Sequence, residues 1–354
     1  MEERTEEHAA VLSVRGLTVS FAVRRDGAWR DVAAVTDVAF GLAPGECLAL
    51  VGESGCGKSV LASALLGLLP GNADVSGSAL LDGVDLLAAD EATLAGRIRG
   101  RRVGLIPQSP ANHLTPVRTI RSQLAETVRE LTPHADRQAA VLDAAERALF
   151  PADHLDRYPH ELSGGLAQRA ATALALVADA PLLLADEPTT GLDRDLVDRT
   201  AAELRRLVDA GRSLLLITHD LTAAEQVADR VAVMYAGRIA EIADAATFFG
   251  APGPRHPYAR GLLDALPTRA FTPIPGMPPT LDDLPPGCAF APRCPSATAV
   301  CTTEIPLLNT PSPGPACHHP ADPHTLTHPT DIPSPPKKNS GLSVYAVGES
   351  ADAT

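Results

Sequence analysis

Three short polar motifs in the first 220 residues combine residue types and spacing that suit phosphate chemistry. The first, GESGCGKS, fits the pattern G-x-x-x-x-G-K-S, follows the buried-strand pattern CLALV and precedes the helical pattern VLASALLGLL. Glycines let backbone N–H groups turn inward around phosphate oxygens, and the helix start adds partial positive charge. Lys58 should reach the β- and γ-phosphates of a nucleotide, and Ser59 should hold Mg²⁺. The residues predicted to bind nucleotide here are Gly52, Ser54, Gly55, Cys56, Gly57, Lys58 and Ser59.

The second motif, LLLADEPTTGLD, places two adjacent carboxylates, Asp186 and Glu187, at the tip of an apolar strand. Phosphoryl transfer mainly needs positioning and stabilisation of charge. With a phosphate loop nearby, Asp186 is predicted to bind Mg²⁺ through water, and Glu187 to polarise the attacking water. An exposed acidic turn after a buried strand is the weaker interpretation.

The third motif, ELSGGLAQR, lies between the other two and could open a helix over LAQRAATALAL. The start of that helix, at Ser163, Gly164 and Gly165, would suit an anion. S-G-G alone is a common loop, but its position shortly before Asp186 favours a phosphate-binding role.

The elements that must position these motifs are those of an α/β domain. Short apolar runs such as VGLIPQ, LLLAD and LLLITHD alternate with longer helical patterns, which is typical of a mostly parallel sheet covered by helices. Of the 32 prolines, 10 fall in residues 1–250 and 22 in residues 251–354, which predicts a boundary near residue 250. Residues 321–354 are rich in Pro, Ser and Thr and are expected to be disordered.

The composition limits the classes of partner. A net charge of −13 argues against broad binding to nucleic acid or to anionic lipid. Four glutamates among the first seven residues are unlike a secretory signal, so we expect the chain to stay in the cytoplasm. Its apolar stretches fall short of the roughly 18 residues of a spanning helix, so any membrane role should run through a protein partner.

Taken in order, these motifs resemble those of the ATP-binding cassette ATPases, over about residues 12–250 with residues 1–11 as a tail. The resemblance implies a P-loop NTPase fold, with a RecA-like parallel-sheet core and antiparallel β and helical subdomains. It implies ATP hydrolysis with Mg²⁺. It further implies that Ser163, Gly164 and Gly165 bind the γ-phosphate of ATP held by a second ATPase subunit, either a paralogue or another copy, in a head-to-tail dimer.

The resemblance assigns roles to further positions. Gln108 in LIPQSP is similar to the glutamine that senses Mg²⁺ and touches the transporter, and His219 in LLLITHD to the histidine that contacts the γ-phosphate. Asp193 resembles a residue of the subunit interface. Phe21 could stack on adenine, although a core role is equally open, and Trp29 or Val35 could lie closer to the base.

The segment from residue 251 to residue 320 resembles the C-terminal extension of the oligopeptide, dipeptide and nickel importer ATPases, on RHPYARGLLDALP and IPGMPPTLDDLPPGCAFAPRCP. The implied function is ATP hydrolysis that drives uptake of oligopeptides or dipeptides. Nickel or another small solute is the alternative cargo, and a non-transport protein of ribosomes or DNA is a further alternative. The implied partners are two integral membrane permeases and an extracellular solute-binding protein, at the cytoplasmic face of the membrane, with no nucleic acid.

Four cysteines of this extension follow the spacing C-x5-C-x6-C-x15-C, which lacks the paired C-x2-C of a zinc ribbon. A metal group could stabilise such a proline-rich segment, which has little core of its own. The resemblance favours a [4Fe–4S] cluster, while Zn²⁺ and free thiols remain open. Cys47 and Cys56 are instead expected to be buried cysteines with no metal role. The predicted ligands are Cys288, Cys294, Cys301 and Cys317.

Overall fold

The computed structural model of the chain describes residues 10–25, 27–110, 113–134, 136–308 and 314–322. The predicted tails, residues 1–11 and 321–354, fall almost wholly outside these described residues.

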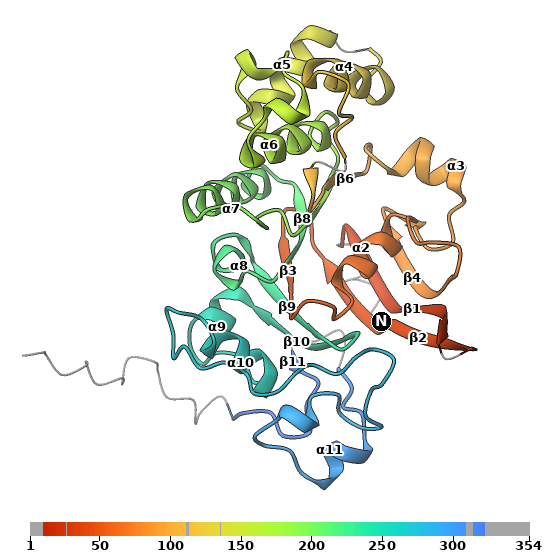
Figure 1. Ribbon diagram of the computed structural model, residues 1–354, viewed down its shortest axis with the longest axis vertical. Coiled ribbons are helices and arrows are strands. Elements are labelled where there is room, and N and C mark those ends of the chain that lie inside the picture. Colours follow the sequence, from red (N-terminus) through yellow and green to blue (C-terminus); the bar gives the residue numbers. More distant parts are fainter. Residues whose placement is uncertain (1–9, 26, 111–112, 135, 309–313, 323–354) are drawn as a thin grey trace, which may run out of the picture.

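A seven-stranded sheet in the order β11-β10-β9-β3-β8-β7-β6 forms the centre of the molecule (Figure 1). The five strands from β9 to β6 are parallel, whereas β10 and β11 join antiparallel at one edge. Every residue of β3 and β8 is buried, as expected of strands covered on both faces. The strands are β3 (Cys47–Val51), β6 (Val103–Ile106), β7 (Leu182–Asp186), β8 (Ser213–Thr218), β9 (Arg230–Tyr235), β10 (Arg238–Asp244) and β11 (Gly314–Pro315).

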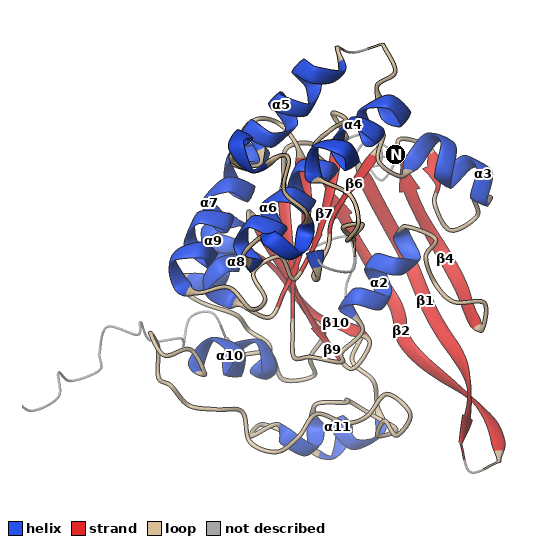
Figure 2. Ribbon diagram, turned by 45° about the horizontal axis from the view of Figure 1, so that its top comes forward, coloured by secondary structure: helices blue, strands red, loops and turns tan. Residues whose placement is uncertain are grey.

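A second, antiparallel sheet has the order β2-β1-β4-β5 and lies beside the first. Helix α2 packs against β1 and β2 on one side and β7 on the other, so it joins the two sheets (Figure 2). Leu12 and Leu17 of the second sheet share a core with Leu61 of α2. The bounds are β1 (Leu12–Arg25), β2 (Ala28–Leu42), β4 (Ala73–Leu81), β5 (Val84–Asp85) and α2 (Lys58–Leu65).

Helices cover the central sheet and form a separate helical end. Helix α8 packs on β3 and β8, and α6 on β6. The helical end is built by α4 and α5, which pack on α6 around a second core that includes Leu124, Val141 and Ala170. The longer helices are α4 (Ile120–Leu131), α5 (Arg137–Arg147), α6 (Gly164–Ala175), α7 (Arg194–Asp209), α8 (Leu221–Val227) and α10 (Pro257–Asp264). Shorter ones are α3 (Glu91–Thr93), η1 (Leu94–Ile98), η3 (Ala152–His154), η4 (Pro159–Glu161), α9 (Ala245–Phe249), η5 (Ala291–Arg293) and α11 (Ala299–Thr303).

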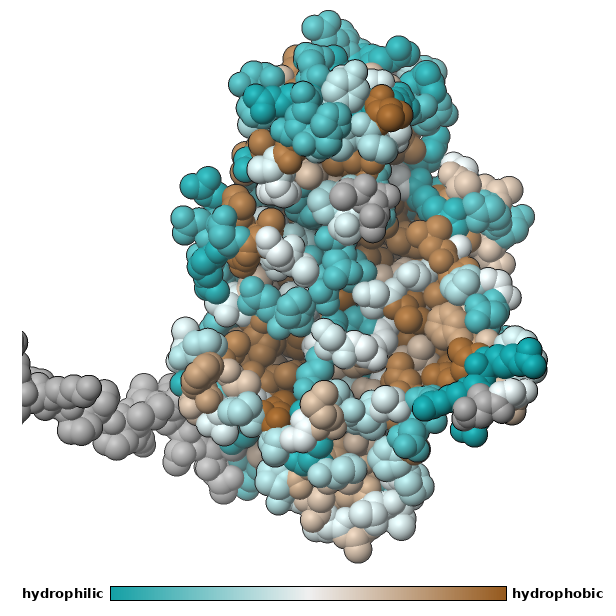
Figure 3. Space-filling view, in the orientation of Figure 1, coloured by the Kyte–Doolittle hydropathy of each residue, from teal (hydrophilic) through white to brown (hydrophobic). Residues whose placement is uncertain are grey.

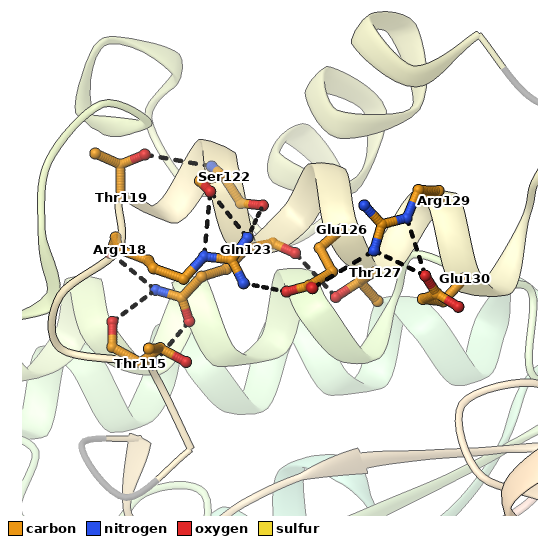
Figure 4. Close-up of polar contacts among 9 residues, drawn as sticks. All are labelled: Thr115, Arg118, Thr119, Ser122, Gln123, Glu126, Thr127, Arg129 and Glu130. Carbon is orange, nitrogen blue, oxygen red and sulfur yellow. Dashed lines mark hydrogen bonds and ion pairs between the residues drawn. The ribbon is translucent and has the colours of Figure 1, made fainter.

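A polar network fixes the loop that leads into α4 (Figure 4). The buried amide of Gln123 accepts from the Thr115 N–H at 2.8 Å and donates to the carbonyls of Thr115 at 3.1 Å and Arg118 at 3.0 Å. Thr119 caps the helix by accepting from the Ser122 N–H at 3.3 Å. Residues 115–119 are therefore held against the first turn of α4.

The residues after α9 pack onto the two sheets at several points. Strand β11 pairs with β10, where Glu241 lies opposite Pro315. Tyr258 of α10 and Phe290 belong to a third core together with Val231 of β9. Asp282 forms an ion pair with Arg25 of the β1–β2 hairpin. The extension thus adds to the central sheet and touches both sheets.

None of the described helices is both long and apolar enough to cross a membrane. On the face drawn in Figure 3, hydrophilic side chains cover most of the end built by α4 and α5, and apolar side chains show through the middle of the molecule.

One buried carboxyl makes stability depend on pH. Glu203 of α7 is buried, and its Oε1 has no hydrogen-bond partner among the described residues. Burial raises the pKa of this carboxyl from 4.5 to about 7, although Arg206 and Arg169 oppose the shift. A carboxyl whose pKa is higher in the folded than in the unfolded chain stabilises the fold at pH values below the pKa of the unfolded chain. That contribution is lost as the pH rises through about 7.

Glu203→Gln should therefore raise the free energy of unfolding at about pH 8 by about 1 to 3 kcal/mol, with little effect near pH 4.5. Urea unfolding at both pH values measures this. Glu146→Gln, at an exposed site on α5, is the control. An effect of equal size at both pH values would contradict the assignment.

Candidate functional site

The loop between β3 and α2 needs glycine at two positions because other backbone lies against it. A Cβ on Gly52 would sit 2.2 Å from the Met234 carbonyl oxygen, and one on Gly57 would sit 2.3 Å from that of Ala34. Gly57 also has φ of +108°, a conformation that L side chains rarely adopt. The predicted phosphate loop is thus a tightly packed turn at the end of a buried strand.

The ammonium of Lys58 is buried in this loop and bonded to neutral groups. Its Nζ donates to the carbonyls of Gly52 at 2.8 Å and Glu53 at 3.1 Å, and lies 3.7 Å from Cys56 Sγ. Burial raises the pKa of the Cys56 thiol, so this partner stays neutral. A buried cation surrounded by neutral dipoles is a strong site for an anion such as phosphate.

Ser59 and Asp186 meet although 127 positions separate them in the chain. The Ser59 hydroxyl donates to Asp186 Oδ1 at 3.1 Å, because α2 starts beside the end of β7. Burial raises the pKa of Asp186, and the Ser59 bond opposes that shift. A hydroxyl and a carboxylate are the hard oxygen ligands that Mg²⁺ prefers, so these two residues fit the predicted ion.

Three polar side chains converge on one oxygen of Glu187. Its Oε2 lies 3.1 Å from His219 Nδ1, accepts from Thr190 Oγ1 at 3.0 Å, and accepts from Gln108 Nε2 at 3.3 Å. Glu187 has a left-handed backbone, with φ of +46°, and donates its N–H to the Ile217 carbonyl at 2.7 Å. The ends of parallel strands meet at one sheet edge, which brings these segments together. Thr190 was not predicted, although it lies inside the second motif.

The third motif lies elsewhere. Ser163 caps α6 by accepting from the Leu166 N–H at 3.4 Å, and Asp193 caps α7 by accepting from the Leu196 N–H at 3.0 Å. Within the described residues, both side chains bond only to their own helices. Both are exposed, and so is Gly164. The chain alone does not bring this motif to the phosphate loop.

Gly165 of α6 lies against the side chain of Leu196 of α7. A Cβ there would lie 2.8 Å from Cδ1 of Leu196, so α6 and α7 approach closely at their N-termini. The two helix starts therefore lie near each other, with Ser163, Gly164 and Asp193 exposed.

The three residues considered for adenine stacking differ in exposure. Phe21 of β1 is half-buried and packs on the core shared by the two sheets, Trp29 is 70% exposed, and Val35 has no exposed surface. Val35 therefore has no surface to offer a base. The role of Phe21 stays a prediction.

The four cysteines of the extension line one small pocket, together with His256, His318 and His319. Burial raises the pKa of Cys288 and Cys294, and that of Cys317 to about 11, so these thiols are neutral at neutral pH. Among the described residues, no group of three or more His, Cys, Asp or Glu side chains is placed to hold a metal ion. Cys47 and Cys56 are buried, as expected.

Glu53, like Thr190, is a residue of this site that the sequence analysis did not single out. It occupies a variable position of the phosphate-loop pattern, yet its N–H donates to Tyr258 Oη at 2.9 Å. Its carboxylate pairs with Arg293, 240 positions further along the chain. Only the folded chain shows such distant contacts.

Comparison with known proteins gives two family matches. The family described as "ABC transporter" matches residues 35–190, and the one described as "Oligopeptide/dipeptide transporter, C-terminal region" matches residues 240–301. A putative peptide import ATP-binding protein of Brucella ovis is 40% identical over 84% of this chain and 93% of its own length. The dipeptide transport ATP-binding protein DppD of Bacillus subtilis is 41% identical over 84% of this chain and 90% of its own length.

Solved structures share the fold. A dimeric, post-hydrolysis ATP-binding cassette bound to ADP and Pi matches with a TM-score of 0.59 and 22% identity, over 66% of this chain and 98% of its own. The cbiO1 structure from Clostridium perfringens matches with a TM-score of 0.57 and 26% identity, over 68% of this chain and 91% of its own.

The close backbone packing of the phosphate loop predicts a difference between two glycines. Gly57→Ala should lower the free energy of unfolding by about 2 to 4 kcal/mol, since it adds a clash to backbone strain. Gly55 has φ of +82°, but nothing lies within 4 Å of a Cβ added there. Gly55→Ala should therefore lower the free energy of unfolding by only about 1 kcal/mol. Urea unfolding of both variants measures the difference, and equal losses would refute the packing argument.

Proposed function

The chain belongs to the ATP-binding cassette transporter family, and on that basis we propose that it is the ATP-hydrolysing subunit of an importer of oligopeptides or dipeptides. The predicted P-loop NTPase fold is confirmed, with a mainly parallel core, an antiparallel sheet and a helical end. The observation that carries the proposal is the convergence on Glu187 beside the phosphate loop, in a chain that matches the oligopeptide/dipeptide C-terminal region.

ATP would bind with its phosphates against the loop of residues 52–59. Lys58 would exchange its carbonyl partners for β- and γ-phosphate oxygens, and Phe21 would stack on adenine. Mg²⁺ bound to the nucleotide would neutralise phosphate charge, with Ser59, Asp186 and Gln108 as the protein groups near it.

Glu187 would orient and polarise the water that attacks the γ-phosphate. Its Oε2 lies next to Gln108 and His219, and these two side chains would contact the water and the γ-phosphate once nucleotide enters. The Thr190 hydroxyl holds the carboxylate in its orientation.

A second ATPase subunit would complete the site. Ser163, Gly164 and Asp193 lie exposed at the starts of α6 and α7, with the buried Gly165 beside them, and there a paralogue or second copy could meet them head to tail. Hydrogen-bond donors at a helix start suit the γ-phosphate of ATP held by the opposite subunit. ATP-driven closure would then shift the pair between two arrangements.

The complex would include two integral membrane permeases and an extracellular solute-binding protein, with this chain at the cytoplasmic face of the membrane. The supporting observation is similarity to peptide import and dipeptide transport ATP-binding proteins over 84% of the chain. We divide the chain into the ATPase domain, residues 12–250, and the extension, residues 251–320, which carries the cysteines.

The cysteine pocket is proposed to hold a [4Fe–4S] cluster through Cys288, Cys294, Cys301 and Cys317. All four thiols line one pocket, which is what such a cluster needs. A single Zn²⁺ held by the same four thiolates is the alternative. The cluster would supply cross-links within a segment that has little core.

Glu187→Gln tests the catalytic assignment. The variant keeps the shape of the side chain but loses the charge that polarises water, so its turnover number should fall at least about a hundredfold. The Kd for MgATP should stay within about threefold, since the phosphate loop is unchanged. Glu146→Gln on α5 is the control. Hydrolysis near the wild-type rate in Glu187→Gln would reject the assignment.

Anaerobic purification tests the cysteine pocket. We expect a brown protein with about four irons per chain, and loss of that iron in Cys301→Ser. Cys47→Ala, a cysteine of the central sheet, should keep the iron. Colourless protein with one zinc per chain, or with no metal, would overturn the cluster.

A further inference from the structure

A side chain of the C-terminal extension forms an ion pair with the phosphate loop. Arg293 meets the carboxylate of Glu53 with both ends of its guanidinium: Nη1 lies 2.7 Å from Oε2, and Nη2 lies 3.0 Å from Oε1. This two-pronged geometry is the strongest that an arginine and a carboxylate can form. Glu53 directly follows the first glycine of the loop.

Arg293 is itself held from several sides. Its Nε donates to the Pro275 carbonyl at 2.9 Å and its Nη1 to Tyr235 Oη at 3.3 Å. The guanidinium carbon lies 5.9 Å from the ring centres of both Tyr235 and Phe290. The side chain is 5% exposed, so the charge has left water and needs the Glu53 carboxylate as its partner.

All three polar parts of Glu53 are engaged. Its N–H donates to Tyr258 Oη at 2.9 Å, its carboxylate binds Arg293, and its carbonyl accepts from Lys58 Nζ at 3.1 Å. Two of these partners come from the extension and the third is the phosphate-binding lysine. Glu53 therefore joins the extension to the part of the loop that should hold ATP.

The charge of Glu53 gives this contact a consequence for binding. A carboxylate inside a phosphate loop repels the triphosphate, and at 28% exposure water screens Glu53 only in part. A guanidinium bound to both oxygens cancels that charge and fixes its direction. Without Arg293, the Glu53 carboxylate would be an unpaired negative charge close to the bound triphosphate.

We propose that Arg293 is a positioning residue of the nucleotide site: it acts through Glu53, cancelling the charge of that carboxylate and holding the phosphate loop in shape for ATP. The C-terminal extension is then part of the ATP site. This inference rests on the proposed function, because it assumes that the loop binds MgATP. It assigns no step of hydrolysis to Arg293.

The test is the Kd of the full-length chain for MgATP, measured by titration calorimetry. Arg293→Gln should raise the Kd about tenfold, the effect of one uncompensated charge near the ligand. The double variant Glu53→Gln, Arg293→Gln should return the Kd to within about threefold of wild type, because it removes the repelling charge as well. A purely structural role of Arg293 would not give this rescue.

Two further variants serve as controls, so that a change in Kd is not mistaken for a loss of folding. Arg293→Lys keeps the charge without the fork and should give an intermediate Kd. Arg260→Gln, on α10, removes an arginine whose Nη2 binds the Pro254 carbonyl at 3.2 Å, and should leave the Kd unchanged. An unchanged Kd in Arg293→Gln, or a double variant no better than the single one, would overturn the inference. Failure of the wild-type chain to bind MgATP would instead overturn the proposed function.

Discussion

The buried ammonium of Lys58 is the constraint on which the rest of the site depends. A charge that lies 4% exposed among neutral carbonyls is costly unless an anion completes its surroundings. The loop can wrap so closely around Lys58 only because Gly52 and Gly57 let it pass against other backbone. The parallel sheet then places Asp186 and Glu187 at the same edge as this charge.

Much of this arrangement could be predicted from local sequence. Strand, glycine-rich turn and helix follow one another directly in CLALVGESGCGKS, and the strand that ends in Asp186 is a plain apolar run. The convergence of Gln108 and His219 on Glu187 follows from parallel strands ending at one edge. Thr190 was missed because a hydroxyl in a turn has no pattern of its own.

The contacts that the extension makes could not be foreseen in the same way. Proline content marked its start, but β11 is two residues long and pairs with β10 through contacts distant in sequence. Likewise, Glu53 occupies a position where the phosphate-loop pattern accepts any residue, and its partners Tyr258 and Arg293 lie more than 200 positions away. Long-range contacts of this kind depend on the whole fold, so no short window of sequence contains them. In the folded chain, Arg293 directly precedes Cys294, which lines the cysteine pocket, so that pocket lies close to the ATP site.

The most direct measurement is ATP hydrolysis by this chain reconstituted in lipid vesicles with the proposed partners: a paired ATPase, two permeases and a solute-binding protein. If the chain powers a peptide importer, oligopeptides or dipeptides should raise the rate of hydrolysis and accumulate on the opposite side of the membrane in step with it. Hydrolysis that is unaffected by peptide, or that rises only with nickel, would contradict this function.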